Sequence, residues 1–419
     1  MSTLPTDNGL EGPQNRSVFE SLPTEILLNI VCNITDLASL DSLIRASPRV
    51  NSAFDRFAVE ITNAVLSSGY THDDTKALIL EITDIRSSRF RIGDLREFKL
   101  FMSQPLLVVS GREESQASPT LPRDTDPKII RTVLATARRL TGMTLDCLEF
   151  YLRSLTSTRP QMLVDTTFKF WSHTHTVDGN IYVPAFKEKH TGRPVPVRDI
   201  DPFTWEEMQR VYRAFWRLQL IYDVKLAAIK GRLPWTSEDH RILQRSYGPD
   251  LFRRHPVHVQ EEVKEFRSVA DYIGLGYGPD RMRHFHSLLK QEIVCTPAPC
   301  FSELERAYTL PAPGQHDHVK LCSASPGLQF WTRNRRTALP DTQPWTYSPL
   351  SLIGFEYFQE FGFAFWSAER LRARACLPPD NQEAHRLLAG NSPDYGRDHE
   401  VFYTWLSILT PQQLDIVDV

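Results

Sequence analysis

The stretch "LPTEILLNIVCNITDLASLDSLIRASPRVNSAF", Leu22–Phe54, decides the fold of the first part of this chain. Its apolar residues recur every three or four positions in three successive runs, which is the period of an amphipathic α-helix. The three runs are Ile26/Ile30/Ile34 with Leu27 and Val31, then Leu37/Leu40/Leu43/Ile44, and then Val50/Phe54/Phe57/Ile61. The pattern therefore predicts three consecutive helices.

Residues that favour helix starts precede each of these runs. Pro23 suits a first helical position, and Glu25 places a carboxylate in the first turn, where the helix dipole favours it. Asp36 and Ser47 fit the N-caps of the second and third helices, and Pro48 again suits a first position. Three helices of about ten residues are marginal alone and need a surface on which to bury their apolar faces.

Composition and charge place the whole chain among ordinary globular proteins. It has 419 residues, of which 41% are hydrophobic and 24% charged, and its formal net charge is −3. This balance gives no electrostatic reason to expect nucleic acid or an anionic membrane as a partner. No apolar run approaches the roughly 20 residues that cross a bilayer, and the first twenty residues lack the pattern of a secretory signal. Six scattered cysteines without a C-x-x-C pair are expected to be reduced, in the cytoplasm or the nucleus.

The remainder of the chain predicts a mostly α protein with one small β hairpin. Amphipathic stretches cover Thr71–Ser103, Ile129–Leu140 and Leu145–Leu155, and the strongest helix signal is a capping box of Thr204 and Glu207 that begins a helix reaching Gly231. Further helices are expected at Thr236 and after Pro256, over the long segment 348–376 and at the end of the chain. The hairpin is expected between 166 and 203, around Asp178-Gly179-Asn180. Residues 1–17 are expected to be a disordered leader, and 110–128 a flexible connection.

Catalytic motifs are absent from the sequence. It contains no Gly-Lys pair for a phosphate-binding loop, no G-x-S-x-G and no H-E-x-x-H. "GLGYG", Gly274–Gly278, follows a helix rather than a strand and lacks a third glycine at the required spacing, so we interpret it as a helix end and a turn.

Three other groups of residues carry two interpretations each. The pairs His173/His175 and His316/His318 are either metal ligands or loop histidines. Arg333–Arg336 is either a site for acidic groups or a solvated basic loop. One set of aromatic residues lines either a ligand groove or the hydrophobic core: Trp205, Phe215, Trp216, Trp235, Phe355, Phe358, Phe363, Phe365 and Trp366.

The opening stretch resembles an F-box, the helical motif of about fifty residues found in substrate receptors of SCF-type cullin–RING ubiquitin ligases. The resemblance rests on Leu22-Pro23-x-Glu25-Ile26-Leu27, then Asp36-Leu37, then Ala46-Ser47 and an aromatic at Phe54. It covers about residues 18–62. Two residues depart from the family pattern: Pro48 stands where a basic or polar residue is common, and Phe54 where tryptophan is more frequent.

The resemblance implies the following expectations. Residues 18–62 would dock a Skp-family adaptor and through it a cullin, and 67–419 would form a mostly α domain, loosely similar to regions of filamentous-fungal F-box-like proteins, that binds an unknown protein substrate. The chain would be an adaptor without catalytic residues or a cofactor. The positions that match residues facing the adaptor or the core of the motif are Leu22, Pro23, Ile26, Leu27, Ile30, Leu37, Leu40, Leu43 and Phe54. The alternatives are a structural hairpin of the larger domain, a metal protein or enzyme that uses His173 and His175, and an F-box scaffold that works outside the ligase.

Overall fold

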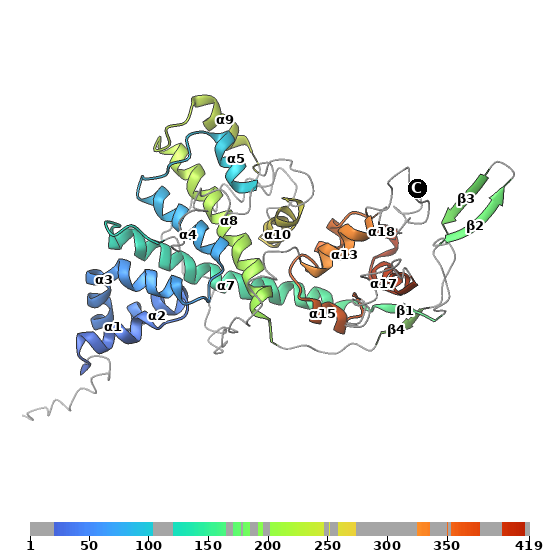
Figure 1. Ribbon diagram of the computed structural model, residues 1–419, viewed down its shortest axis with the longest axis horizontal. Helices are drawn as coiled ribbons and strands as arrows, with labels where there is room; N and C mark the ends of the chain where they lie inside the picture. The colour runs from blue at the N-terminus through green and yellow to red at the C-terminus, as the bar shows by residue number, and fades with distance from the viewer. Residues whose placement is uncertain are drawn as a thin grey trace, which may run out of the picture. The chain divides into compact units, whose positions relative to one another are not determined.

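Most of the residues that the computed structural model describes lie in α-helices (Figure 1). The described residues are 21–103, 120–164, 171–176, 179–184, 192–195, 202–246, 251, 259–273, 325–335, 350, 353–377 and 396–414. The predicted fold class, mostly α with a small β hairpin, is confirmed. The leader 1–17 and most of the connection 110–128 lie outside the described residues.

The chain divides into two compact units. Unit 1 comprises Met1–Thr71 and Ala117–Arg139, and unit 2 comprises His72–Gln116 and Leu140–Val419. Helix α7 (Pro127–Ser157) contributes its first turns to unit 1 and the remainder to unit 2. The sequence predicted two helices here, but Gly142 does not interrupt α7, because a glycine inside a helix costs only about 1 kcal/mol relative to alanine.

Unit 1 begins with the three predicted helices: α1 (Thr24–Cys32), α2 (Leu37–Ala46) and α3 (Pro48–Ser67). Both α1 and α2 pack against α3. The predicted caps of the second and third helices are confirmed. The Asp36 carboxylate accepts hydrogen bonds from the backbone N–H and the hydroxyl of Ser39 (2.8 and 2.7 Å), and the Ser47 hydroxyl accepts one from the backbone N–H of Val50 (3.3 Å). Pro23 is the N-cap residue of α1 rather than its first helical residue.

Helix α3 is twice the expected length and is kinked. It runs for 20 residues, and Phe57, at φ −129° and ψ 29°, interrupts its helical backbone. The segment 117–139 completes the unit. The Asn63 side chain pairs with both backbone groups of Leu121 (2.8 and 3.3 Å), and the Arg131 guanidinium binds Asp55 (2.7 Å) and lies 5.0 Å from the ring centre of Phe54. Unit 1 therefore extends beyond residues 18–62.

Unit 2 is built around α8, which is buried along almost its whole length. The helices of this unit, besides the second part of α7, are α4 (Asp73–Arg86), α5 (Leu95–Ser103), α8 (Trp205–Ile229), α9 (Ser237–Arg245), α10 (Val259–Tyr272), α13 (Pro326–Arg335), α14 (Glu356–Gln359), α15 (Ala368–Ala373), α17 (Gly396–Ser407) and α18 (Pro411–Leu414). Helices α4 and α10 both pack on α8. The predicted capping box at the start of α8 is confirmed: the Thr204 hydroxyl accepts from the Glu207 N–H, and the Glu207 carboxylate accepts from the Thr204 N–H.

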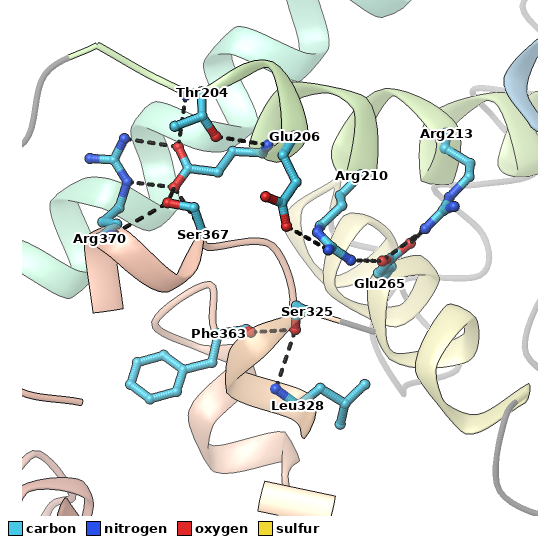
Figure 2. Close-up of polar contacts among 11 residues, drawn as sticks. Thr204, Glu206, Arg210, Arg213, Glu265, Ser325, Leu328, Phe363, Ser367 and Arg370 are labelled. Carbon is cyan, nitrogen blue, oxygen red and sulfur yellow. Dashed lines mark hydrogen bonds and ion pairs between the residues drawn. The ribbon is translucent and has the colours of Figure 1, made fainter. Parts of the chain in front are cut away.

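Ion pairs inside unit 2 join α8 to its neighbours (Figure 2). Arg210 binds Glu206 one turn earlier (2.7 Å) and Glu265 on α10 (3.2 Å). Arg213 binds the same Glu265 (2.9 Å) and Asp74 on α4 (3.2 Å). All five side chains are at most 10% exposed, so each charge depends on its partners rather than on water.

A second buried pair connects the start of α8 to the start of α15 (Figure 2). The Glu207 carboxylate, fully buried, accepts two hydrogen bonds from the Arg370 guanidinium (both 2.8 Å). It also accepts hydrogen bonds from the backbone N–H (2.9 Å) and the hydroxyl (2.8 Å) of Ser367, the N-cap residue of α15. One carboxylate therefore takes part in the N-terminal caps of two helices.

The long helix predicted over 348–376 is wrong. In its described part, 353–376, the helices are the short α14 and α15, separated by turns. Gly362 has φ +76°, a backbone conformation that favours glycine, and a Cβ there would lie 2.8 Å from the Trp366 ring. Ser367 then starts a new helix. The aromatic residues of this segment are buried in a compact series of turns. Their spacing in the sequence happens to match the helical period, and this match led to the wrong prediction.

Two small antiparallel sheets accompany the helices. Strand β2 (Trp171–Thr176) pairs with β3 (Gly179–Pro184), which agrees with the predicted hairpin, although Gly179 and Asn180 are already in the strand. Strand β1 (Gln161–Leu163) pairs with β4 (Gly192–Pro194), a pairing that the sequence did not indicate. Helix α17 packs on β1, and its Trp405 ring lies 4.5–5.3 Å from the ring centres of Phe330, Phe358 and Phe363.

Candidate partner-docking surface

Helix α1 presents apolar side chains on two of its faces. Leu27 and Val31 are completely buried, whereas Ile26 and Ile30, one turn apart, are 48% and 39% exposed. Large hydrophobic residues this exposed are few within the described residues: Ile26, Ile30, Phe150, Val164 and Ile229. Pro23, directly before α1, is also exposed, and it lies three positions before Ile26 and seven before Ile30, on the same face of the helix. We call these three exposed residues, Pro23, Ile26 and Ile30, the α1 strip.

The nine residues expected at the docking site divide into three groups. Four of them, Leu27, Leu37, Leu40 and Phe54, are buried in the described structure. Leu22 and Leu43 are half-buried, and the three residues of the α1 strip are exposed. The helical period predicted that these positions are apolar, but it did not separate the internal residues from the exposed ones. Internal and exposed residues can be told apart only once the packing of α1 and α2 on α3 is known.

The α1 strip lies between polar side chains. Glu25 and Asn29 are exposed on the same helix, and the Asn33 amide donates to the Asn29 carbonyl (2.8 Å) at the helix end. Full burial of an isoleucine contributes about 1.5–3 kcal/mol, so covering the exposed fractions of Ile26 and Ile30 would contribute roughly 1–2.5 kcal/mol together. An exposed apolar strip with a polar rim is the usual anatomy of a protein-binding surface.

Cysteine chemistry offers no alternative at this surface. Burial and the nearby Glu60 carboxylate raise the pKa of the half-buried Cys32 thiol, so it is a poorer nucleophile than an ordinary cysteine. Burial also raises the pKa of Cys147 and, to about 12, that of Cys376. These three thiols are free, and Cys295, Cys300 and Cys322 lie outside the described residues.

The aromatic set predicted to line either a groove or the core lies in the core. Each of its nine members is at most 7% exposed, with Trp235 the least buried. Ring stacking and indole hydrogen bonds hold several of them in place; the Trp235 N–H, for example, donates to the carbonyl of Ile92 (2.8 Å). These residues therefore do not form the wall of an open substrate groove.

For the metal-site hypothesis, the structure gives the position of the two histidines on a strand and no further support. His173 and His175 lie two positions apart on β2, opposite Tyr182 and Asn180 of β3. Among the described residues no three His, Cys, Asp or Glu side chains gather as a metal site requires. Gly274–Gly278, the pair His316/His318 and the side chains of Arg333–Arg336 lie outside what the structure describes.

Comparison with known proteins finds no matching family model, no matching curated protein and no matching solved structure. None of the helices in the described ranges combines the length and the apolarity needed to cross a membrane.

Proposed function

We propose that residues 18–62 are an F-box that docks a Skp-family adaptor, and that the chain is a non-enzymatic substrate receptor of an SCF-type cullin–RING ubiquitin ligase. The observation that carries the proposal is the α1 strip. Helix α1 begins after Pro23 and packs on α3; it buries Leu27 but leaves Ile26 and Ile30 exposed at positions where the F-box resemblance expects adaptor contacts or core residues.

The remaining residues of the motif support the proposal through their structural roles. Leu37 and Leu40 are buried, as befits the core of a small three-helix unit, and Asp36 and Ser47 cap the helices that hold α1 in place. A docking helix on a rigid support loses little conformational entropy when a partner binds. The residues required for docking therefore differ from those required for folding.

The double variant Ile26→Arg/Ile30→Arg tests the proposed docking. Both side chains are partly exposed, so the variant is expected to fold, whereas two buried charges at an apolar interface would weaken adaptor binding by at least about a hundredfold. The measurement is co-elution and calorimetric titration of the full chain with a purified Skp-family adaptor. The matched control is Ile229→Arg in unit 2, which is 66% exposed and should bind like the unchanged chain. Equal adaptor binding by the Ile26/Ile30 variant and the control would refute the docking.

In this proposal unit 2 holds a target protein and raises the concentration of its lysines near the ligase. Affinity purification followed by mass spectrometry, with the unchanged chain and the Ile26/Ile30 variant, separates the two roles. The variant should lose the adaptor and the cullin but retain the target. Recovery of the adaptor without a cullin by the unchanged chain would favour a scaffold that works outside the ligase.

A further inference from the structure

The most exposed aromatic residue among the described residues of unit 2 lies among carboxylates. Phe150, on α7, is 50% exposed, and its ring centre lies 5.5 Å from that of Tyr272 on α10. Asp146 and Glu149 precede it by one turn and by one residue, and Asp271 is adjacent to Tyr272. Glu360, which follows α14 and interacts electrostatically with Asp271, adds a fourth carboxylate. We call these six residues the aromatic–acidic surface.

Hydrogen bonds, one of them buried, hold the three segments of this surface together. The Tyr151 hydroxyl, next to Phe150, donates to the carbonyl of Ser268 on α10 (2.6 Å). The Ser154 hydroxyl, one turn after Phe150, donates to the carbonyl of Glu360 (2.7 Å). Gln359 donates to the carbonyl of Lys264 (2.8 Å). The aromatic and acidic groups therefore lie on segments that are already fixed to one another. This favours binding, because little conformational entropy is lost when a partner binds.

Two of the four carboxylates, Asp146 and Glu360, are in an environment that disfavours their negative charge and raises their pKa. Burial, and then the charge of Glu149, raise the pKa of Asp146; burial and the Asp271 charge likewise raise that of Glu360. Burial, followed by nearby acidic groups that include Asp146, raises the pKa of Tyr272 to about 12. A cation placed here would relieve this repulsion and would also meet the electron-rich faces of Phe150 and Tyr272.

We propose that the aromatic–acidic surface binds a lysine- or arginine-rich segment of a partner protein. Charge complementarity selects this occupant: carboxylates pair with basic side chains, and exposed aromatic rings bind the same side chains by cation–π contact. Arg153, which is 79% exposed, binds Glu149 one turn earlier on α7 (3.0 Å). A basic peptide would displace this arginine from Glu149.

The experiment uses the full chain and a fluorescein-labelled peptide of alternating lysine and alanine, with a glutamate–alanine peptide for comparison, followed by fluorescence anisotropy. The chain should bind the lysine peptide and not the glutamate peptide, with weaker binding as salt increases. Phe150→Ala should weaken binding about two- to fivefold through loss of the cation–π contact. Phe150→Leu should weaken it to the same extent, because leucine keeps most of the side-chain volume but has no aromatic ring. The double variant Asp146→Asn/Glu149→Gln should weaken binding about tenfold.

Two further variants separate this surface from general charge effects. Arg153→Gln should tighten peptide binding, because it removes the competing cation, and a mere loss of structure would not produce that gain. Glu238→Gln is the matched control: Glu238 is also an exposed helix carboxylate paired with an arginine in the next turn, Arg241, and its loss should leave binding unchanged. Unchanged binding by both Phe150→Ala and the double variant, or equal weakening by Glu238→Gln, would overturn the proposal.

This test is independent of the proposed adaptor docking. The aromatic–acidic surface belongs to unit 2, whereas the α1 strip belongs to unit 1. The Ile26→Arg/Ile30→Arg variant should bind the lysine peptide normally, so failure of either proposal leaves the other measurable.

Discussion

Glu207→Ala should destabilise unit 2 more than any substitution of a surface ion pair. The Glu207 carboxylate is completely buried and accepts five hydrogen bonds: one from the Thr204 N–H, two from Ser367 and two from Arg370. Truncation to alanine removes all five acceptor contacts. It leaves the Arg370 guanidinium, only 3% exposed, without its carboxylate.

The expected loss follows from these contacts. Removing one partner of a buried ion pair costs about 3–5 kcal/mol, because the remaining charge stays in a poorly solvated site. Loss of the capping-box interaction at Thr204 costs about a further 1 kcal/mol. Arg370 keeps its hydrogen bond to the Pro202 carbonyl (3.2 Å) and its position over the Trp366 ring (5.2 Å), which offset part of the cost. We therefore expect the free energy of unfolding to fall by about 3–5 kcal/mol.

Urea unfolding followed by tryptophan fluorescence measures this change. A double-mutant cycle with Arg370→Ala gives the coupling free energy of the pair. Glu238 and Arg241, an exposed pair on α9, form the control cycle and should couple far more weakly, because water screens both charges. A loss below about 1 kcal/mol for Glu207→Ala, or a coupling as small as that of the control pair, would refute the reasoning about burial.

Two further predictions concern the stability of unit 2. Because burial and Glu149 raise the pKa of Asp146, its ionised form disfavours the folded state above that raised pKa; Asp146→Asn should therefore raise the melting temperature at neutral pH. The gain should vanish as pH falls below about 3.9, the ordinary pKa of aspartate, and a constant gain at every pH in a calorimetric series would contradict this explanation. Gly362→Ala should lower the free energy of unfolding by about 2–4 kcal/mol, because it combines a left-handed backbone with a contact against the buried Trp366 ring. Gly231→Ala, at φ +64° with open space around it, should cost only about 1–2 kcal/mol in the same urea titration, and equal losses at both sites would argue against the steric contact.

Local signals in the sequence predicted the parts of the fold that depend on neighbouring residues. The caps at Asp36, Ser47 and Thr204 were predictable because a capping side chain bonds to a backbone N–H within three residues. The apolar period likewise predicted α1, α2 and α8. Around Gly362 the same period was misleading, because aromatic residues of a series of turns are buried from several directions at once.

The candidate sites were less predictable, because exposure is a property of packing between distant segments. Ile26 and Leu27 are adjacent and similar in hydrophobicity, yet one is 48% exposed and the other completely buried. Phe150 had no distinguishing signal in a helix full of apolar residues. Asp146 lies one turn before Phe150 on the same helix face, but Asp271 and Glu360 come from distant segments, so only the packing brings these groups together.

The connection through Glu207 has a consequence for the synthesis of the chain. Ser367 follows Glu207 by 160 residues, and the ribosome adds about 5–20 residues per second. After α8 emerges, its first turn therefore waits roughly 8–30 s for the segment that neutralises its carboxylate. During this interval Glu207 lacks the hydrogen bonds from Ser367 and Arg370 and remains hydrated. The first turn of α8 can therefore reach its final hydrogen bonding only after Ser367 and Arg370 have been synthesised.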